Sequence, residues 1–187
     1  VSDVRILHNQ FLDVGNLTGV QYDHSTIYTH AVGTRVHICG NTFVGRGTTT
    51  GAYGATTAIE THGSDQVVTG NIIHRYAQAM NITGVSVETI GAVVTGNTIR
   101  DCASGVHLWS YYYGSNETEP ALVNTVVSQN TMIINRDIWT TAIPAMLGSG
   151  VILNPSNTAH TKHLVITDNI IEFKPTTVET TSDNQSS

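Results

Sequence analysis

The sequence predicts an all-β protein: a right-handed parallel β-helix (a solenoid) of about six coils, each turning at an asparagine. The first observation behind this prediction is composition. The chain has 187 residues, of which 12% are charged and 40% hydrophobic. It is rich in Gly, Thr, Asn, Val and Ile, which favours strands and turns. No long window shows the 3.6-residue apolar period of an amphipathic helix.

The second observation is a motif that recurs six times. Each copy ends in an asparagine, with a large apolar residue three positions before it and another two positions after it. The asparagines are Asn9, Asn41, Asn71, Asn97, Asn130 and Asn169. Asparagine suits a turn because it tolerates left-handed backbone and because its amide can bond to nearby backbone, so each copy is predicted to turn at its asparagine.

Stacking of these copies explains their shared pattern. Their apolar positions would form one continuous core, and the asparagines would bond to the coils above and below. The unequal spacing of the copies favours a parallel β-helix over leucine-rich or propeller repeats.

The third observation is a further strand in each coil, in which a small residue precedes an alternating apolar and polar run. Period-two alternation is typical of a strand with one face toward water. The runs are residues 19–23, 58–62, 79–83, 105–109 and 150–154. Stacking them predicts one outward row of Gln21, Glu60, Asn81, His107 and Ile152. A second outward row holds Asp23, His62, Thr83, Trp109 and Asn154.

The domain organisation follows from the extent of the repeat. Residues 1–173 are predicted to form the β-helix domain, a fragment of a longer chain, and residues 174–187 a polar linker or tail. Both ends of the stack lack a cap, so we expect neighbouring sequence or another subunit to cover at least one of them. The net charge of −6 argues against a nucleic-acid partner. No apolar run approaches the roughly 20 residues of a membrane span, so no membrane insertion is expected.

Acidic and histidine side chains on the outward rows are the candidate catalytic groups. Glu60 and Asp23 would lie on neighbouring coils with about 8 Å between their backbones. This separation suits an inverting glycosidase pair, and equally two solvated acids. His62 follows Glu60 on the same face, and the group serves acid–base chemistry or, alternatively, a divalent cation. Glu-x-His spacing is weak evidence for metal, so no metal ligands are assigned and no cofactor is expected.

Candidate substrate-binding residues surround these groups. Aromatic rings at the end of the fourth such strand can stack on sugar rings, or else pack a loop onto the helix flank. The predicted binding residues are His107, Trp109, Tyr111, Tyr112, Asn81 and Gln21.

With these repeats, the chain resembles the pectin-lyase-like β-helix superfamily. The outward rows contain no Arg or Lys to act as the base of a pectate lyase, and no Asp-Asp precedes Thr61-His62-Gly63 as in polygalacturonases. The chain is most similar to the β-helix domain of a bacteriophage tail spike or neck appendage. That resemblance implies a homotrimer in the virion tail that binds, and usually cleaves, a bacterial surface polysaccharide or teichoic acid.

Three functions remain open from the sequence. The first is a hydrolase-type depolymerase of a surface glycan or cell-wall polymer, with carboxylates on the outer sheet face. The second is a non-catalytic β-helix that binds glycan or a receptor, or serves as a structural part of a phage tail. The third is a secreted polysaccharide lyase. The repeat itself does not distinguish between them, because the same scaffold serves enzymes and binding proteins.

Overall fold

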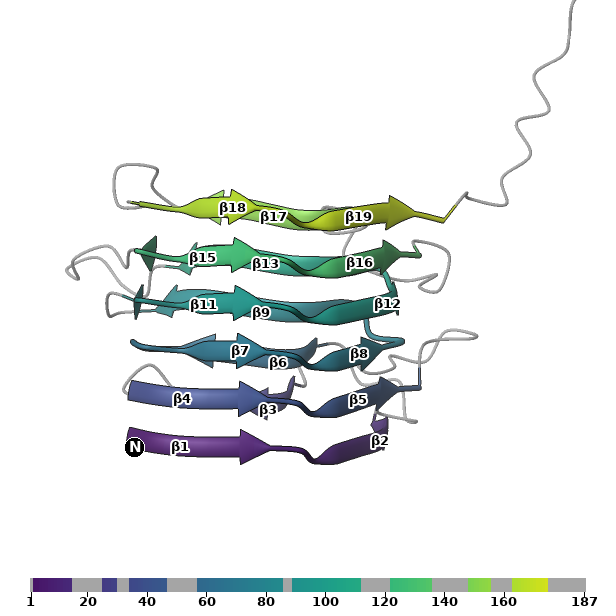
Figure 1. The fold of residues 1–187 in the computed structure, drawn as a ribbon, viewed down its shortest axis with the longest axis horizontal. Helices are drawn as coiled ribbons and strands as arrows, with labels where there is room; N and C mark the ends of the chain where they lie inside the picture. Colours follow the sequence, from purple (N-terminus) through teal and green to yellow (C-terminus); the bar gives the residue numbers. More distant parts are fainter. Residues whose placement is uncertain are drawn as a thin grey trace, which may run out of the picture.

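The chain folds into stacked parallel β-sheets, and the part described contains strands and no helix (Figure 1). A computed structural model describes residues 2–14, 25–29, 34–46, 57–85, 89–111, 122–135, 148–155 and 163–174. Along the chain, one strand joins each of three sheets in turn, and the cycle then repeats. The prediction of an all-β parallel solenoid is therefore confirmed. The polar tail after residue 174 lies outside the described residues.

We call the three sheets A, B and C. Sheet A contains β1 (Ser2–Leu7), β4 (Thr34–Cys39), β7 (Val67–Thr69), β11 (Val93–Thr95), β15 (Val126–Ser128) and β18 (Val165–Thr167). Sheet B contains β2 (Gln10–Val14), β5 (Thr42–Gly45), β8 (Ile72–His74), β12 (Thr98–Cys102), β16 (Thr131–Ile134) and β19 (Ile170–Phe173). Sheet C contains β3 (Ser25–Tyr28), β6 (Thr57–His62), β9 (Gln78–Val85), β13 (Ser104–Tyr111) and β17 (Ser149–Pro155). A small pair joins β10 (Thr89–Ile90) to β14 (Leu122–Val123).

The apolar positions of the repeat stack into the core, as predicted. In sheet A, Ile38 lies in register with Ile6 and Val68, and in sheet B, Phe43 lies in register with Phe11 and Ile73. The rings of Phe11 and Phe43 are stacked, with centroids 4.8 Å apart. Burial of these rows supplies the main driving force for folding, because apolar surface removed from water stabilises the chain by about 25 cal/mol per Å².

The six asparagines form a hydrogen-bonded ladder through the stack. From Asn9 to Asn130, each Nδ2 donates to the Oδ1 of the asparagine in the following coil at 2.9–3.1 Å, and each backbone N–H donates to the same Oδ1 at 2.8–3.1 Å. From Asn41 onward, Nδ2 also donates to the carbonyl of the apolar residue three positions before the preceding asparagine. Both polar atoms of each interior amide are thereby satisfied inside the core.

Left-handed backbone occurs one residue before each asparagine, and not at the asparagine itself. The residues with positive φ at these places are His8, Gly40, Gly70, Gly96, Gln129 and Asp168. Because the asparagine side chain has to enter the core, the tight bend falls on the preceding residue, where glycine serves three times.

The outward rows of sheet C keep the predicted register from the second coil onward. Glu60 pairs with Asn81, Asn81 with His107, and His107 with Ile152. In the first coil, the register differs from the prediction. The strand beside β6 is β3, and Tyr28 occupies the position beside Glu60 that was expected for Gln21.

The sequence does not fix where the third strand of the first coil begins, because apolar residues alternate both near residue 21 and near residue 27. Residues 19–23 lie outside the described residues.

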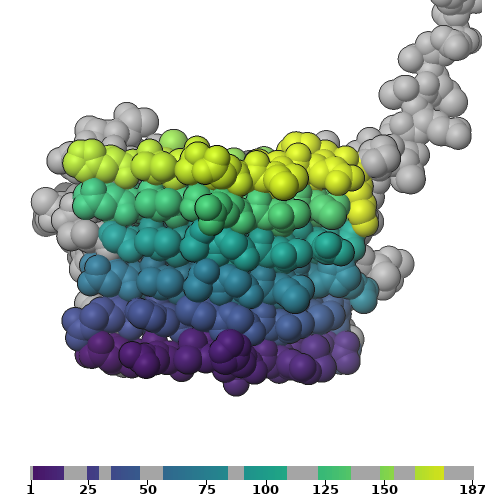
Figure 2. Space-filling view, viewed as in Figure 1, coloured from purple at the N-terminus to yellow at the C-terminus, as the bar shows by residue number. Residues whose placement is uncertain are grey.

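The last described coil lies at one end of the stack (Figure 2), and several of its core-type side chains are exposed. Ile166, Ile171 and Phe173 are 46%, 40% and 55% exposed, whereas their partners one coil below are buried. An exposed apolar end is costly. That a further element covers one end remains a prediction.

Asn97→Ala should lower the free energy of unfolding by about 3 kcal/mol, because it leaves several buried backbone and amide groups without partners. Asn97→Asp should also destabilise, since a carboxylate cannot donate to Val68 O or Asn130 Oδ1. Urea unfolding measures both effects. The matched control is Asn9→Ala in the first coil. The Asn9 side chain is exposed, so this substitution should lower the free energy of unfolding by only about 1 kcal/mol. Equal losses at residues 9 and 97 would contradict the ladder's role.

Gln129→Gly should raise the free energy of unfolding by about 0.5 kcal/mol. Gln129 is exposed and has φ 55°, a conformation that costs a non-glycine residue about 1–2 kcal/mol, partly offset by glycine's flexibility in the unfolded chain. The reverse change, Gly96→Gln, should destabilise, although an added Cβ there makes only ordinary contacts at 3.9–4.0 Å. Thermal unfolding of the pair tests the prediction, and a loss of stability in Gln129→Gly would overturn it.

Candidate functional site

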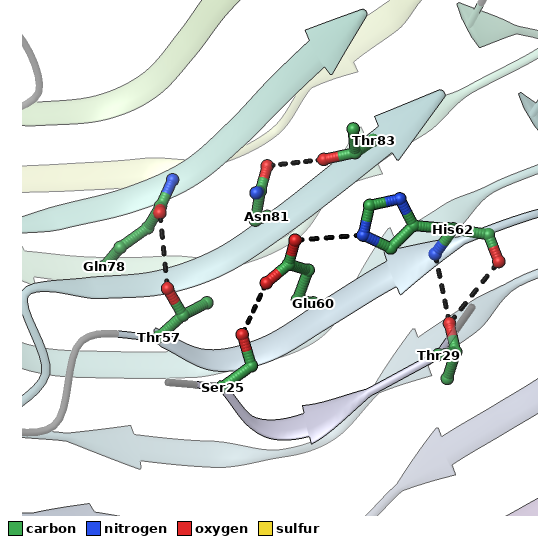
Figure 3. A network of polar contacts seen from close by, with 8 residues as sticks. All are labelled: Ser25, Thr29, Thr57, Glu60, His62, Gln78, Asn81 and Thr83. Carbon is green, nitrogen blue, oxygen red and sulfur yellow. Dashed lines mark hydrogen bonds and ion pairs between the residues drawn. The ribbon is translucent and has the colours of Figure 1, made fainter. Parts of the chain in front are cut away.

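The outward face of sheet C gathers polar side chains from three neighbouring strands (Figure 3). Ser25 lies in β3, and Thr29 directly follows it. Glu60 and His62 lie in β6, and Asn81 lies in β9. Alternation along β6 places Glu60 and His62 on the same side of the strand. Ile59, between Ala58 and Glu60, is fully buried in the core. The candidate site is therefore built on the rigid stack.

Glu60 is fixed by two hydrogen bonds. Ser25 Oγ donates to Glu60 Oε2 at 2.5 Å, and Glu60 Oε1 lies 2.9 Å from His62 Nε2. The Glu60 side chain is 16% exposed. Burial raises the pKa of this carboxyl, but the hydrogen bonds from His62 and Ser25, together with the charge of His62, outweigh it and lower the pKa below its usual value. Glu60 is thus an ionised acceptor at neutral pH.

His62 is held by this carboxylate and by its own backbone. The His62 N–H donates to Thr29 Oγ1 at 3.0 Å, and the Tyr28 ring lies 5.1 Å from the imidazole. Because ionised Glu60 only accepts, Nε2 carries the proton in the neutral ring, and Nδ1 presents a lone pair. Nδ1 is buried and has no hydrogen-bond partner among the described residues. A buried nitrogen without a partner costs stability, which marks it as a functional candidate.

This geometry separates the roles of the two residues. A carboxylate with a lowered pKa is poorly suited to donate a proton, as the acid of a glycosidase must. It is well suited to orient a histidine and to stabilise the imidazolium that forms when that histidine accepts a proton. Glu60 is therefore suited to position the imidazole, and His62 is the candidate base.

The remaining predicted residues fall into two groups. Asn81 stands on the strand beside Glu60, where its Oδ1 accepts a 2.7 Å hydrogen bond from Thr83. His107 lies one strand further, and burial lowers its pKa to about 4, so it is neutral at physiological pH. Asp23, Gln21 and Tyr112 lie outside the described residues, as do the side chains of Trp109 and Tyr111, whose backbones belong to β13.

Sequence reasoning missed the contribution of β3. Ser25, Tyr28 and Thr29 all contact Glu60 or His62, yet no repeat pattern in the sequence fixes their position relative to the asparagine motif. The pattern Ser-x-x-Tyr-Thr carries no recognisable signal. Only the pairing of β3 with β6 identifies these residues.

Comparisons with protein families, curated proteins and solved structures found no match to this chain. Within the described ranges, no three His, Cys, Asp or Glu side chains form a group that can hold a metal ion. The same part of the chain contains no helix with the length and apolar character needed to cross a bilayer.

Glu60→Gln should destabilise the fold in a pH-dependent manner. A folded pKa below the unfolded value of about 4.3 means that ionised Glu60 adds stability above that pH and loses it as the pH falls through the folded pKa. The difference in unfolding free energy between wild type and variant should therefore shrink below about pH 4. Urea unfolding across pH tests this, with exposed Glu172→Gln as the control. A difference independent of pH would contradict the assignment.

Proposed function

We propose that this chain is a β-helix domain that binds and degrades a bacterial surface glycan or cell-wall polymer, with His62 as the catalytic base and Glu60 orienting it. The observation that carries the proposal is the unpartnered Nδ1 of His62 among the described residues, on a ring whose other nitrogen is held at 2.9 Å by an ionised carboxylate. An oriented base of this kind contributes roughly 10²–10⁴-fold to a proton transfer.

The chemistry proposed is proton abstraction by His62. In hydrolysis, Nδ1 takes a proton from water, which attacks the glycosidic or phosphodiester bond while the leaving oxygen is protonated by another group. In elimination, Nδ1 takes a proton from the carbon next to the one that bears the leaving oxygen; a C=C bond forms, the C–O bond breaks, and another group protonates the leaving oxygen. Glu60 holds the imidazole in both cases. We favour hydrolysis. The proposed proton donor is Asp23, which lies outside the described residues.

Polar groups near His62 suit a hydroxyl-rich substrate. Asn81 and Thr83 extend the row toward β13, where His107, Trp109 and Tyr111 follow. We propose that this strip, with Tyr112 and Gln21, binds the polymer. Hydroxyl and amide groups bond to sugar hydroxyls, and aromatic rings stack on the apolar faces of sugars.

The wider setting is also a proposal. We infer a right-handed helix of about six coils, with the asparagine motif at one turn, of the pectin-lyase-like type found in phage tail spikes and neck appendages. On this basis the domain assembles as a homotrimer in the virion tail and acts on the outside of a bacterium. A secreted enzyme is the alternative location. Three parallel sheets and the asparagine ladder support the fold part of this inference.

A second candidate is a non-catalytic glycan-binding or structural β-helix. The observation that favours it is burial: the side chains of His62 and Glu60 are only 6% and 16% exposed, and His107 is fully buried. Substrate has to displace what covers Nδ1; the exposed Tyr28 ring packs beside the imidazole, with ring centroids 5.1 Å apart. Without that displacement, the pair serves only to link β3 to β6.

Wild-type protein should shorten a bacterial surface polymer, measured by size-exclusion chromatography or by loss of viscosity. His62→Gln should reduce the rate by at least about 100-fold, and Glu60→Gln by a similar order, because each removes the oriented base. The matched control is His74→Gln, which breaks another histidine–carboxylate pair, with Asp101 at 2.7 Å, on sheet B. Cleavage by both His62→Gln and Glu60→Gln at the wild-type rate, or none by wild type on any host polymer, would favour the non-catalytic function.

A further inference from the structure

Two columns of uncharged side chains run along the stack where sheet A passes into sheet B. Only two residues separate β7 from β8, and the two sheets lie side by side (Figure 1). The outward position two residues before each asparagine holds Leu7, Cys39, Thr69, Thr95, Ser128 or Thr167. The position directly after each asparagine holds Gln10, Thr42, Ile72, Thr98, Thr131 or Ile170. We call these two columns the uncharged strip.

Both columns of the uncharged strip are straight. Parallel pairing keeps each of them in register from the first coil to the sixth. The residue between the columns, directly before the asparagine, is Gly40, Gly70, Gly96 or Gln129 in the second to fifth coils. The end coils place His8 and Asp168 there. The strip is therefore free of charge across its whole width in the four middle coils.

Large apolar side chains of the strip are open to water. Leu7, Ile72 and Ile170 are 41%, 50% and 66% exposed. The next outward position on sheet A widens this surface, because it is valine in the third to sixth coils. Exposed apolar surface on the flank of a folded domain is costly, and it is typical of a contact with another protein.

Charged and titratable side chains border the strip and occupy the opposite sheet. The next outward position on sheet B holds His74, Arg100 and Glu172 in the third, fourth and sixth coils. The outer face of sheet C carries Glu60 and His62. An apolar surface with a polar border marks an interaction site, and this one lies on different sheets from the acid–base pair.

The spacing of the strip favours a second copy of this chain as its partner. Its side chains recur once per coil, about 4.8 Å apart, so a partner that fits coil after coil needs the same repeat. If two copies pack side by side with parallel stacks, each coil meets the same coil of the other copy. Identical side chains then face one another, which apolar and hydroxyl groups tolerate and like charges do not. The strip meets this condition in the second to fifth coils.

We propose that the uncharged strip is the surface through which copies of this chain pack side by side, with their stacks parallel. The proposal rests on the homotrimer in the proposed function and names the face that holds it together. Contact along the strip buries the junction of sheets A and B. It leaves the outer face of sheet C, with Glu60 and His62, open to substrate.

Sedimentation of the whole chain over a range of concentrations tests the contact, and wild type should form a trimer. Ile72→Glu places like charges opposite one another and should raise the dissociation constant at least about tenfold. Thr98→Glu, in register with residue 72 one coil further, should act in the same direction. The matched control, Ile152→Glu on sheet C, should change it less than about twofold. Circular dichroism verifies folding. A monomeric wild type, or equal weakening by the control, would overturn the proposal.

Cys39 reports the orientation of the copies. It lies in the strip and is half-buried, whereas Cys102 is fully buried. In parallel copies, Cys39 faces the same residue of its neighbour, so a short bis-maleimide should link two copies, and Cys39→Ser should abolish the product. In fully overlapping antiparallel copies, the two thiols would be three coils apart, about 14 Å. An oligomer that gives no linked product would overturn the parallel arrangement.

Polymer cleavage, measured on the same samples, separates this proposal from the catalytic function. A wild type that cleaves polymer as a monomer would overturn the contact and support the catalytic role of His62. A trimer that Ile72→Glu dissociates, but that cleaves no polymer, would support the contact and count against catalysis.

Discussion

The hydrogen bonds between asparagine side chains set the alignment of neighbouring coils. A carboxamide in an apolar core is tolerable only if its oxygen and both of its N–H groups find partners, and each missing partner costs about 1–3 kcal/mol. Asn71 meets this demand through Asn41, Asn97 and the carbonyl of Ile38, one coil on either side. If one coil slipped by one residue along its strands, these bonds would break and its core side chains would turn toward water. The ladder therefore supplies specificity, while burial of the apolar rows supplies most of the stability.

The outer surface inherits its order from this alignment. Because every coil has the same register inside, side chains outside also form rows, and each row combines residues far apart in sequence. Glu60 meets Ser25 from a strand 35 residues earlier, and Arg75 meets Arg46 from 29 residues earlier. The two sets lie on different sheets and have different character. One is the shielded Glu60–His62 pair, and the other is the contact of the exposed Arg75 side chain with the backbone of Arg46.

Much of the fold could be predicted because the repeat is visible in the sequence. Every apolar position flanking the six asparagines lies in the register that the alignment predicts. The site was less accessible. Period-two alternation predicts that Glu60 and His62 share one face of β6, and they lie 2.9 Å apart. Their further contacts come from Ser25 and Thr29, which the sequence did not indicate, and Asp23 lies outside the described residues. A solenoid tolerates loops of any length between its strands, so local patterns cannot place β3.

The asparagine ladder also gives the stack a head and a tail. Every bond between two of these amides runs from the N–H groups of one coil to the oxygen of the next, without reversal. Consequently Asn9 has an oxygen with no donor from the ladder, while Asn169 has a backbone N–H with no ladder oxygen to receive it. The two end faces therefore need opposite partners. The face with Asn9 needs a hydrogen-bond donor, and the face with Asn169 needs a hydrogen-bond acceptor. The ladder is therefore directional, and a coil added in the opposite orientation could not continue these hydrogen bonds at either end.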